Sequence, residues 1–141
     1  MKKIDSFGGE HSFLSNFYDE PVRIDGITYP TSEHAYQAMK TDDLTIRKAF
    51  AKLKTAGEAK REGRRVKMRR DWDSVKIQEM ERILEVKFAP GSDLAKSLVE
   101  TGDAELVEGN YWGDTFWGVC KGVGRNELGK CLMRLRLKLR G

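Results

Sequence analysis

Cysteine and proline are scarce in this 141-residue sequence, which has two cysteines and three prolines. Two cysteines are too few for a disulfide framework, and the first residues lack the apolar core of a secretion signal, so we expect a reduced, cytoplasmic protein. No apolar run approaches the roughly 20 residues that a membrane-spanning helix needs, so we expect no membrane partner. The only histidines that could join Cys120 and Cys131 in a metal site are His11 and His34. Their spacing is not that of a zinc site, and we expect no metal.

Several familiar motifs are also missing. The sequence has no P-loop and no Gly-x-Ser-x-Gly elbow. The stretch from Gly118 to Gly129 lacks both the preceding β-prone run and the glycine spacing of a dinucleotide-binding turn. These absences exclude a P-loop nucleotide-binding protein, a hydrolase with a nucleophile elbow and a dinucleotide-binding fold.

Charges are present in both signs but are segregated along the chain, with a net charge of +4. Residues 60–70 carry seven basic side chains against one acid, and residues 121–141 carry the same numbers. The stretch from Ser97 to Cys120 has no lysine or arginine, and its acids are Glu100, Asp103, Glu105, Glu108 and Asp114. This arrangement suits a phosphorylated or nucleic-acid ligand whose chemistry takes place at a carboxylate. Solvated helix faces are the simpler alternative.

Local patterns predict several helices and few strands. Asp25-Gly26 lies between two short β-prone runs and predicts a hairpin over residues 21–29. Helices are expected over residues 31–40, 44–54, 55–62, 73–88, 92–102 and from about 126 onward, with a strand at 104–107. The sequence has no repeat, linker or βαβαβ rhythm, so we predict an α+β fold in which residues 1–141 form one compact domain with a small β-sheet.

The last of these helices has an apolar and a basic side. Its apolar residues, expected to be buried, are Leu128, Cys131, Leu132, Leu135 and Leu139. Its basic residues, expected on the opposite side and beside it, are Arg134, Arg136, Lys138 and Arg140. We therefore expect this helix to cover the core with one face.

Residues 29–40 place an unusual set of polar groups on one helix face. Glu33, Tyr36, Gln37 and Lys40 follow at i, i+3, i+4 and i+7, so an acid, a phenol, an amide and an amine share one side. His34 points elsewhere and is expected to be structural. The face suggests an active site. The alternative is a capping Glu33, a packed Tyr36 and a solvated Lys40.

Two of the three tryptophans lie in a glycine-rich segment, as Trp112-Gly113-Asp114 and Trp117-Gly118. A tryptophan ring can stack on a planar base, and glycine allows close backbone approach to a ligand. The third, Trp72, precedes an amphipathic stretch, where a hydrophobic-staple role fits equally well.

These stretches, with Phe13-Leu14-Ser15-Asn16-Phe17 and the closing segment from Gly124 to Arg136, resemble the NADAR family of YbiA-like N-glycosidases. The resemblance runs from Phe7 to Arg136 in the family's order. It implies a compact α+β fold and N-glycosidase activity without a cofactor. The implied substrates are ADP-ribose on guanine bases of DNA or RNA, or ribosylaminopyrimidine phosphate intermediates of riboflavin biosynthesis. The stretch Phe116–Cys120 differs from the glycine-rich version of the riboflavin-linked proteins and favours the ADP-ribose branch.

The resemblance also implies roles for single residues. Glu33 matches the acid of the family's Glu-His element, Asp114 that of its Trp-Gly-Asp element, and Lys40 a lysine expected to attack the sugar carbon in the ADP-ribose branch. The expected substrate-binding residues are Asn16, Tyr36, Trp72, Trp112, Gly118 and Asn126. Arg64 and Arg65 are expected to hold phosphate, on the ground of charge alone.

The chemistry of such a reaction agrees with these residue types. Breaking a ribose C–N bond builds positive charge on the sugar, so a carboxylate near C1′ and a proton donor near the leaving nitrogen both lower the barrier. Two other readings stay open. One is a module that binds ADP-ribose or a nucleotide without turnover, and the other is a nucleic-acid-binding domain that uses the two basic stretches.

Overall fold

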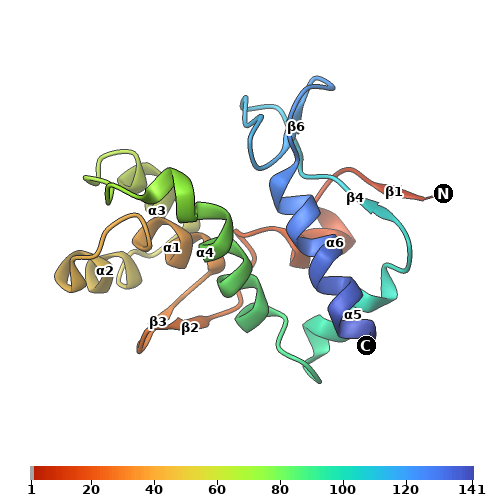
Figure 1. Cartoon of the computed structure of the whole chain (residues 1–141), viewed down its shortest axis with the longest axis horizontal. Coiled ribbons are helices and arrows are strands. Elements are labelled where there is room, and N and C mark those ends of the chain that lie inside the picture. The colour runs from red at the N-terminus through yellow and green to blue at the C-terminus, as the bar shows by residue number, and fades with distance from the viewer. Residues whose placement is uncertain (1) are drawn as a thin grey trace. The chain divides into compact units, whose positions relative to one another are not determined.

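The computed structural model describes residues 2–141 (Figure 1). The chain divides into two compact units. One, which we call the central unit, is Asn16–Lys87. The other, the terminal unit, combines the residues up to Ser15 with Phe88–Gly141. That residues 1–141 act as one domain stays a prediction.

The central unit begins with the expected hairpin. Strands β2 (Val22–Ile24) and β3 (Ile27–Tyr29) pair antiparallel. Asp25 and Gly26 both have positive φ, 51° and 82°, as a two-residue type I′ turn requires. The Asp25 carboxylate accepts hydrogen bonds from Arg82 at 2.8 and 3.1 Å, which ties the turn to the long helix of the unit.

Four helices complete the central unit: α1 (Ser32–Ala38), α2 (Leu44–Ala51), α3 (Ala56–Gly63) and α4 (Trp72–Lys87). Side-chain oxygens of Thr31, Asp43 and Thr55 cap the first three by accepting backbone N–H groups. Every residue of α1 is buried, and α1 packs against the other three helices. A helix of seven residues is too short to be stable alone, so this packing maintains it. Lys40, expected in the last turn of α1, lies two residues beyond its end.

The terminal unit contains a 3-10 helix, η1 (Gly9–Leu14), and the helices α5 (Asp93–Glu100) and α6 (Glu127–Arg140). Its strands have two residues each. Strand β1 (Lys3–Ile4) pairs in parallel with β4 (Glu105–Leu106), and β5 (Gly109–Asn110) with β6 (Val119–Cys120). Its buried apolar side chains include Leu14, Phe88, Leu98, Leu106, Leu128, Cys131, Leu132 and Leu135.

The predicted α+β class is confirmed, and the expected small sheet consists of three separate two-stranded pairs. One detail of the last helix was wrong. Arg136 is buried, not on an exposed basic side, and its guanidinium donates to Thr101 Oγ1 at 2.8 Å. The reason is its position: Leu128, Leu132 and Arg136 follow at intervals of four and share one helix face. Burial lowers the pKa of Arg136.

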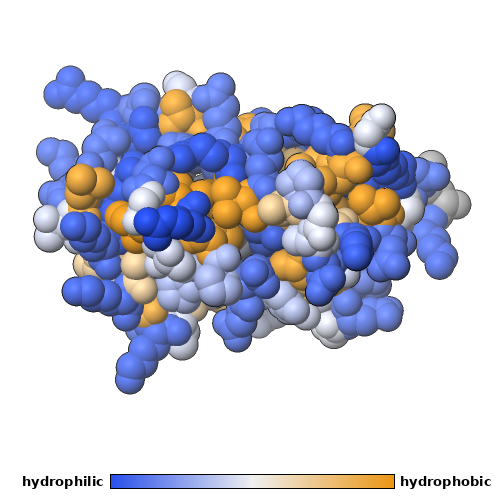
Figure 2. All heavy atoms as spheres, turned by 90° about the horizontal axis from the view of Figure 1, so that it is seen from below, coloured by the Kyte–Doolittle hydropathy of each residue, from blue (hydrophilic) through white to orange (hydrophobic). Residues whose placement is uncertain are grey.

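The surface mixes charged and apolar groups. Figure 2 shows one face on which hydrophilic side chains surround smaller apolar patches. The large apolar side chains with the greatest exposure include Tyr111, Leu137 and Val123. Among the described residues, no helix is long and apolar enough to cross a membrane.

Candidate functional site

The start of α1 is held by Asn16. Its Oδ1 accepts a hydrogen bond from Ser32 Oγ at 3.0 Å, and its backbone carbonyl accepts one from the Glu33 N–H, also at 3.0 Å. His34 is engaged on both sides of its ring, by Thr31 Oγ1 at 2.8 Å and the Leu53 carbonyl at 3.0 Å. Asn16 and His34 therefore fix the start of α1, and with it the position of Glu33. The hydrogen bonds of Asn16 described here are to other residues of the protein, whereas the sequence predicted a role in substrate binding.

The polar face of α1 is assembled as its spacing indicated, but most of it is buried. Glu33 is 8% exposed, Tyr36 7% and Gln37 5%. The Gln37 amide donates to Glu33 Oε2 at 2.6 Å. The Tyr36 ring lies 5.3 Å from the Trp72 ring at an angle of 53°. This face is thus a packed surface. Glu33 does more than cap the helix, because its carboxylate is buried and hydrogen-bonded to Gln37.

Lys40 lies just beyond the end of α1, next to this group of residues. Its ammonium donates to the Gly63 carbonyl at 3.2 Å and lies 5.8 Å from the centre of the Tyr36 ring. Burial lowers the pKa of Lys40; the Glu33 carboxylate opposes this, and the charges of Arg64 and Lys76 add to it. Burial disfavours the charged amine more than Glu33 favours it. The amine is therefore easier to deprotonate than a solvated lysine.

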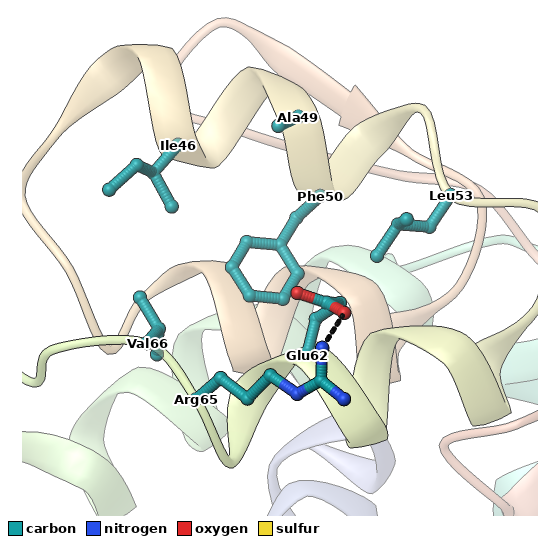
Figure 3. A pocket seen from close by; sticks show the side chains of 7 residues that line it. All are labelled: Ile46, Ala49, Phe50, Leu53, Glu62, Arg65 and Val66. Carbon is teal, nitrogen blue, oxygen red and sulfur yellow. Dashed lines mark ion pairs between the residues drawn. The ribbon is translucent and has the colours of Figure 1, made fainter.

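The two arginines expected to hold phosphate lie differently. Arg64 is exposed at the end of α3 and acts electrostatically on Lys40. Arg65 pairs with Glu62 at 3.5 Å and lines an apolar pocket of about 260 Å³ between α2 and α3 (Figure 3). The other pocket residues are Ile46, Ala49, Phe50, Leu53, Glu62 and Val66. The structure therefore relates Arg64, and not Arg65, to the polar face of α1.

In the terminal unit, Asp114 organises the segment around it. Its Oδ1 accepts hydrogen bonds from the N–H groups of Phe116 and Trp117 at 3.1 and 2.9 Å. Asn110 binds the backbone of Asp114 in turn, accepting from its N–H at 3.0 Å and donating to its carbonyl at 2.9 Å. One oxygen of this predicted catalytic carboxylate thus stabilises a turn.

Aromatic rings surround this turn. Trp112 is half exposed, and its ring contacts that of Tyr111 edge-on at 5.1 Å. Gly113 has a φ of 87°, which favours glycine. Gly118 is buried, and a side chain there would overlap with the Glu108 carbonyl. Of the predicted binding residues in this segment, Trp112 offers ring surface, whereas Gly118 permits a close backbone contact.

Asn126 is used by the protein itself. Its Oδ1 accepts from the Glu108 N–H and its Nδ2 donates to the Leu106 carbonyl, both at 2.9 Å. It is 8% exposed and has a φ of 55°, in the left-handed region that asparagine tolerates. The side chain therefore connects the start of α6 to the strand region, a structural task beside the predicted role in binding.

The structure brings five of the predicted residues into the central unit around α1: Asn16, Glu33, Tyr36, Lys40 and Trp72. It places Trp112, Asp114, Gly118 and Asn126 in the terminal unit. Sequence reasoning did not assign roles to Gln37 and Gly63. The spacing of Glu33 and Gln37 was a signal for the first, but no local pattern marks the second. Within the described residues, no group of three or more potential ligands could hold a metal ion.

Known proteins resemble this chain in sequence and in fold. Residues 5–140 match the model of the NADAR domain. The N-glycosidase YbiA of Escherichia coli is 39% identical over 140 residues, which cover 95% of this chain and 85% of that protein. A riboflavin biosynthesis protein of Vibrio vulnificus is also 39% identical, over 92% of this chain, and the chain spans only 36% of its length.

A solved structure has the same fold as this chain. The NMR structure of E. coli YbiA superposes with a TM-score of 0.86 at 37% identity, covering 99% of this chain and 87% of YbiA. Because the family model matches nearly the whole chain and relatives share 39% of its residues, the chain belongs to the NADAR domain family.

Proposed function

We propose that this chain hydrolyses the bond between a ribose carbon and a nucleobase nitrogen, with Glu33 and Lys40 at the sugar. Several of its relatives are named N-glycosidases, and the chain is accordingly an enzyme that acts on N-glycosyl bonds. The observation that carries the residue assignment is the electrostatic interaction between the buried, hydrogen-bonded Glu33 carboxylate on α1 and the Lys40 amine of lowered pKa just beyond the end of that helix.

Glu33 stabilises the sugar in this scheme. As the C1′–N bond stretches, positive charge develops on the ribose ring, and a carboxylate in a buried setting interacts with that charge more strongly than one in water. A buried acid that acts electrostatically on an amine of lowered pKa is typical of catalytic sites. This favours turnover over a non-catalytic binding module.

Lys40 has two possible roles, which predict different chemistry. As a cation, it neutralises negative charge on the substrate. As a nucleophile, the neutral amine forms a bond to C1′ while the base leaves with the electrons of the C–N bond and takes up a proton. The sugar ring then opens to an imine, and water releases ribose and restores the amine. The lowered pKa of Lys40 supports the nucleophilic role.

Three further predicted residues contact the substrate in this proposal. Trp112 stacks on the base, since half of its side chain is exposed. Asp114 orients water or a ribose hydroxyl with the oxygen not used in its turn. Arg64 attracts phosphate near Lys40.

For the substrate we propose ADP-ribose attached to guanine in nucleic acid. The stretch Phe116–Cys120, which differs from the glycine-rich version of the riboflavin-linked proteins, favours this branch, and the basic character of residues 60–70 suits a phosphorylated ligand. The second candidate is a ribosylaminopyrimidine phosphate. It is favoured by the riboflavin biosynthesis proteins of Vibrio vulnificus and Zea mays, which are 39% and 34% identical to the chain.

One experiment separates these candidates. The protein is incubated with an ADP-ribosylated guanine oligonucleotide and, in parallel, with the ribosylaminopyrimidine phosphate, and the released base and sugar are measured by mass spectrometry. Release from the oligonucleotide alone supports the first candidate, and release from the pyrimidine alone supports the second. Tight binding with no product from either would contradict the assignment of catalytic roles to Glu33 and Lys40.

A further inference from the structure

Gln37 makes a short hydrogen bond within the polar face of α1 and takes no part in the proposed chemistry. It lies one helical turn after Glu33, and its Nε2 donates to Glu33 Oε2 at 2.6 Å. Both side chains are more than nine-tenths buried. Hydrogen bonds to a charged acceptor are stronger than neutral ones, and burial prevents water from replacing the donor. Gln37 therefore fixes the direction in which the Glu33 carboxylate points.

The other side of the Gln37 amide lies against Gly63, the last residue of α3. A Cβ atom at position 63 would overlap with the amide oxygen and carbon of Gln37. Gly63 does not have the positive φ that requires glycine, so its backbone conformation does not explain the glycine at this position. The lack of a side chain is thus used for close approach to Gln37.

The Gln37 amide has little freedom to turn over in this setting. Its Oε1 is buried and accepts no hydrogen bond from the described residues. If the amide were reversed, that oxygen would face the Glu33 carboxylate, and two acceptors would meet. The observed orientation is the one in which the NH2 group serves Glu33.

Gly63 also contacts Lys40, which lies just beyond the end of α1. Its carbonyl accepts the hydrogen bond from Lys40 Nζ at 3.2 Å. One backbone position on α3 therefore limits the Gln37 amide through its missing side chain and holds the Lys40 amine through its carbonyl.

We propose that Gln37 is a positioning residue for Glu33 and that Gly63 keeps the Gln37 amide in its working orientation. This inference rests on the proposed function, in which Glu33 acts at the sugar. Gln37 does not touch the substrate. It holds the carboxylate, and Gly63 provides the space that this requires.

A double-mutant cycle tests the inference. Gly63→Ala is compared with Gly57→Ala, a matched change in the same helix, where the new Cβ meets only Thr55 Oγ1 at 3.8 Å. We expect Gly63→Ala to lower kcat by about ten- to a hundredfold with KM changed less than about twofold, which is the loss of one hydrogen bond to a charged group. Gly57→Ala should leave kcat unchanged.

Gln37→Ala should lower kcat as much as Gly63→Ala does, since the carboxylate loses its donor. In the Gln37→Ala background the overlap is gone, so adding Gly63→Ala should cost less than about twofold more. Rates are measured at a temperature where each variant is folded by circular dichroism. Equal costs of Gly63→Ala in both backgrounds would mean that Gly63 acts independently of Gln37, and would overturn the inference.

A second measurement does not depend on turnover. The side-chain amide resonances of Gln37 in a ¹⁵N NMR spectrum should move in Glu33→Ala and Gly63→Ala and stay in place in Gly57→Ala. If the wild type cleaves no N-glycosidic substrate while these shifts occur, the proposed function fails and the contact described here stands. If the wild type is active, Glu33→Gln is inactive and Gln37→Ala keeps full kcat, the function stands and the positioning role is wrong.

Discussion

The polar side chains described for the two units have different hydrogen-bond partners. In the central unit, Glu33, Gln37 and Lys40 contact one another or α3, and Glu33 and Gln37 are buried. In the terminal unit, the side chains of Asp114 and Asn110 bond to their own backbone segment, and the neighbouring ring of Trp112 is half exposed.

This difference indicates a division of labour. Reacting groups must be held in one geometry, which burial and side-chain hydrogen bonds provide. A surface that receives a planar base needs exposed ring area on a turn whose backbone is already organised. The comparison predicts that substitutions in the central unit affect stability or kcat, and that substitutions around Trp112 affect binding.

The largest expected effect concerns two tryptophans. Trp72 is 4% exposed and packs on Tyr36, so Trp72→Ala should lower the free energy of unfolding by about 3–5 kcal/mol. Trp112→Ala should leave stability nearly unchanged and weaken substrate binding by about 1–3 kcal/mol. Chemical denaturation and binding titrations measure the two quantities. If Trp72→Ala abolished binding at unchanged melting temperature, the two assignments would have to be exchanged.

The next effect is on turnover. Glu33→Gln keeps the size of the side chain and removes its charge, so the developing charge on the sugar loses its partner. We expect kcat to fall by about a hundredfold or more, as for the removal of one oxyanion-hole donor. Single-turnover kinetics with the cleaved substrate measure this, with the melting temperature as a control for folding. Activity within a few-fold of the wild type would remove Glu33 from the mechanism.

A smaller, graded effect is expected from pH. The pKa of Lys40 lies below its ordinary value of 10.5, chiefly because of burial. If Lys40 attacks as a neutral amine, kcat rises by up to tenfold per pH unit below the folded pKa and levels off above it. Borohydride added during turnover should trap the imine as a mass increase on the peptide that contains Lys40.

The lowered pKa of Lys40 also makes the stability of the protein depend on pH. A lysine whose pKa is lowered by folding binds fewer protons in the folded than in the unfolded state. The free energy of unfolding therefore rises as the pH increases from the folded pKa of Lys40 toward 10.5. An active Lys40→Arg variant with no trapped adduct would leave Lys40 as a cation, because arginine cannot act as the nucleophile.

Much of the fold could be predicted because its signals are local. Asp25-Gly26 marked the hairpin, and Thr31, Thr55 and Ser92 marked helix starts, because turn and cap preferences depend on a few neighbouring residues. The parallel pairs β1–β4 and β5–β6 were not predicted. Strands of two residues carry no periodicity, and β1 and β4 come from distant parts of the sequence.

The candidate site divides in the same way. Helical spacing placed Glu33, Tyr36 and Gln37 on one face, because that relation depends on α1 alone. Lys40, in contrast, lies beyond the end of α1 and bonds to the Gly63 carbonyl. The part played by Gly63 is a close approach between two helices, and a single glycine at a helix end looks in the sequence like an ordinary stop signal. Its contact with Gln37 is visible only in the structure.

The smallest expected effect tests the terminal unit at Asp114. Its Oδ1 accepts two backbone hydrogen bonds, which Asp114→Asn can keep and Asp114→Ala cannot. Asp114→Ala should therefore lower the free energy of unfolding by about 1 kcal/mol, and Asp114→Asn by less. Since one oxygen of Asp114 is engaged in the turn, we expect Asp114→Asn to reduce kcat less than Glu33→Gln does. Denaturation curves and single-turnover rates of the three variants provide the comparison. A loss of kcat in Asp114→Asn as large as in Glu33→Gln, at unchanged stability, would place an equally important reacting charge in the terminal unit and end the division of labour between the two units.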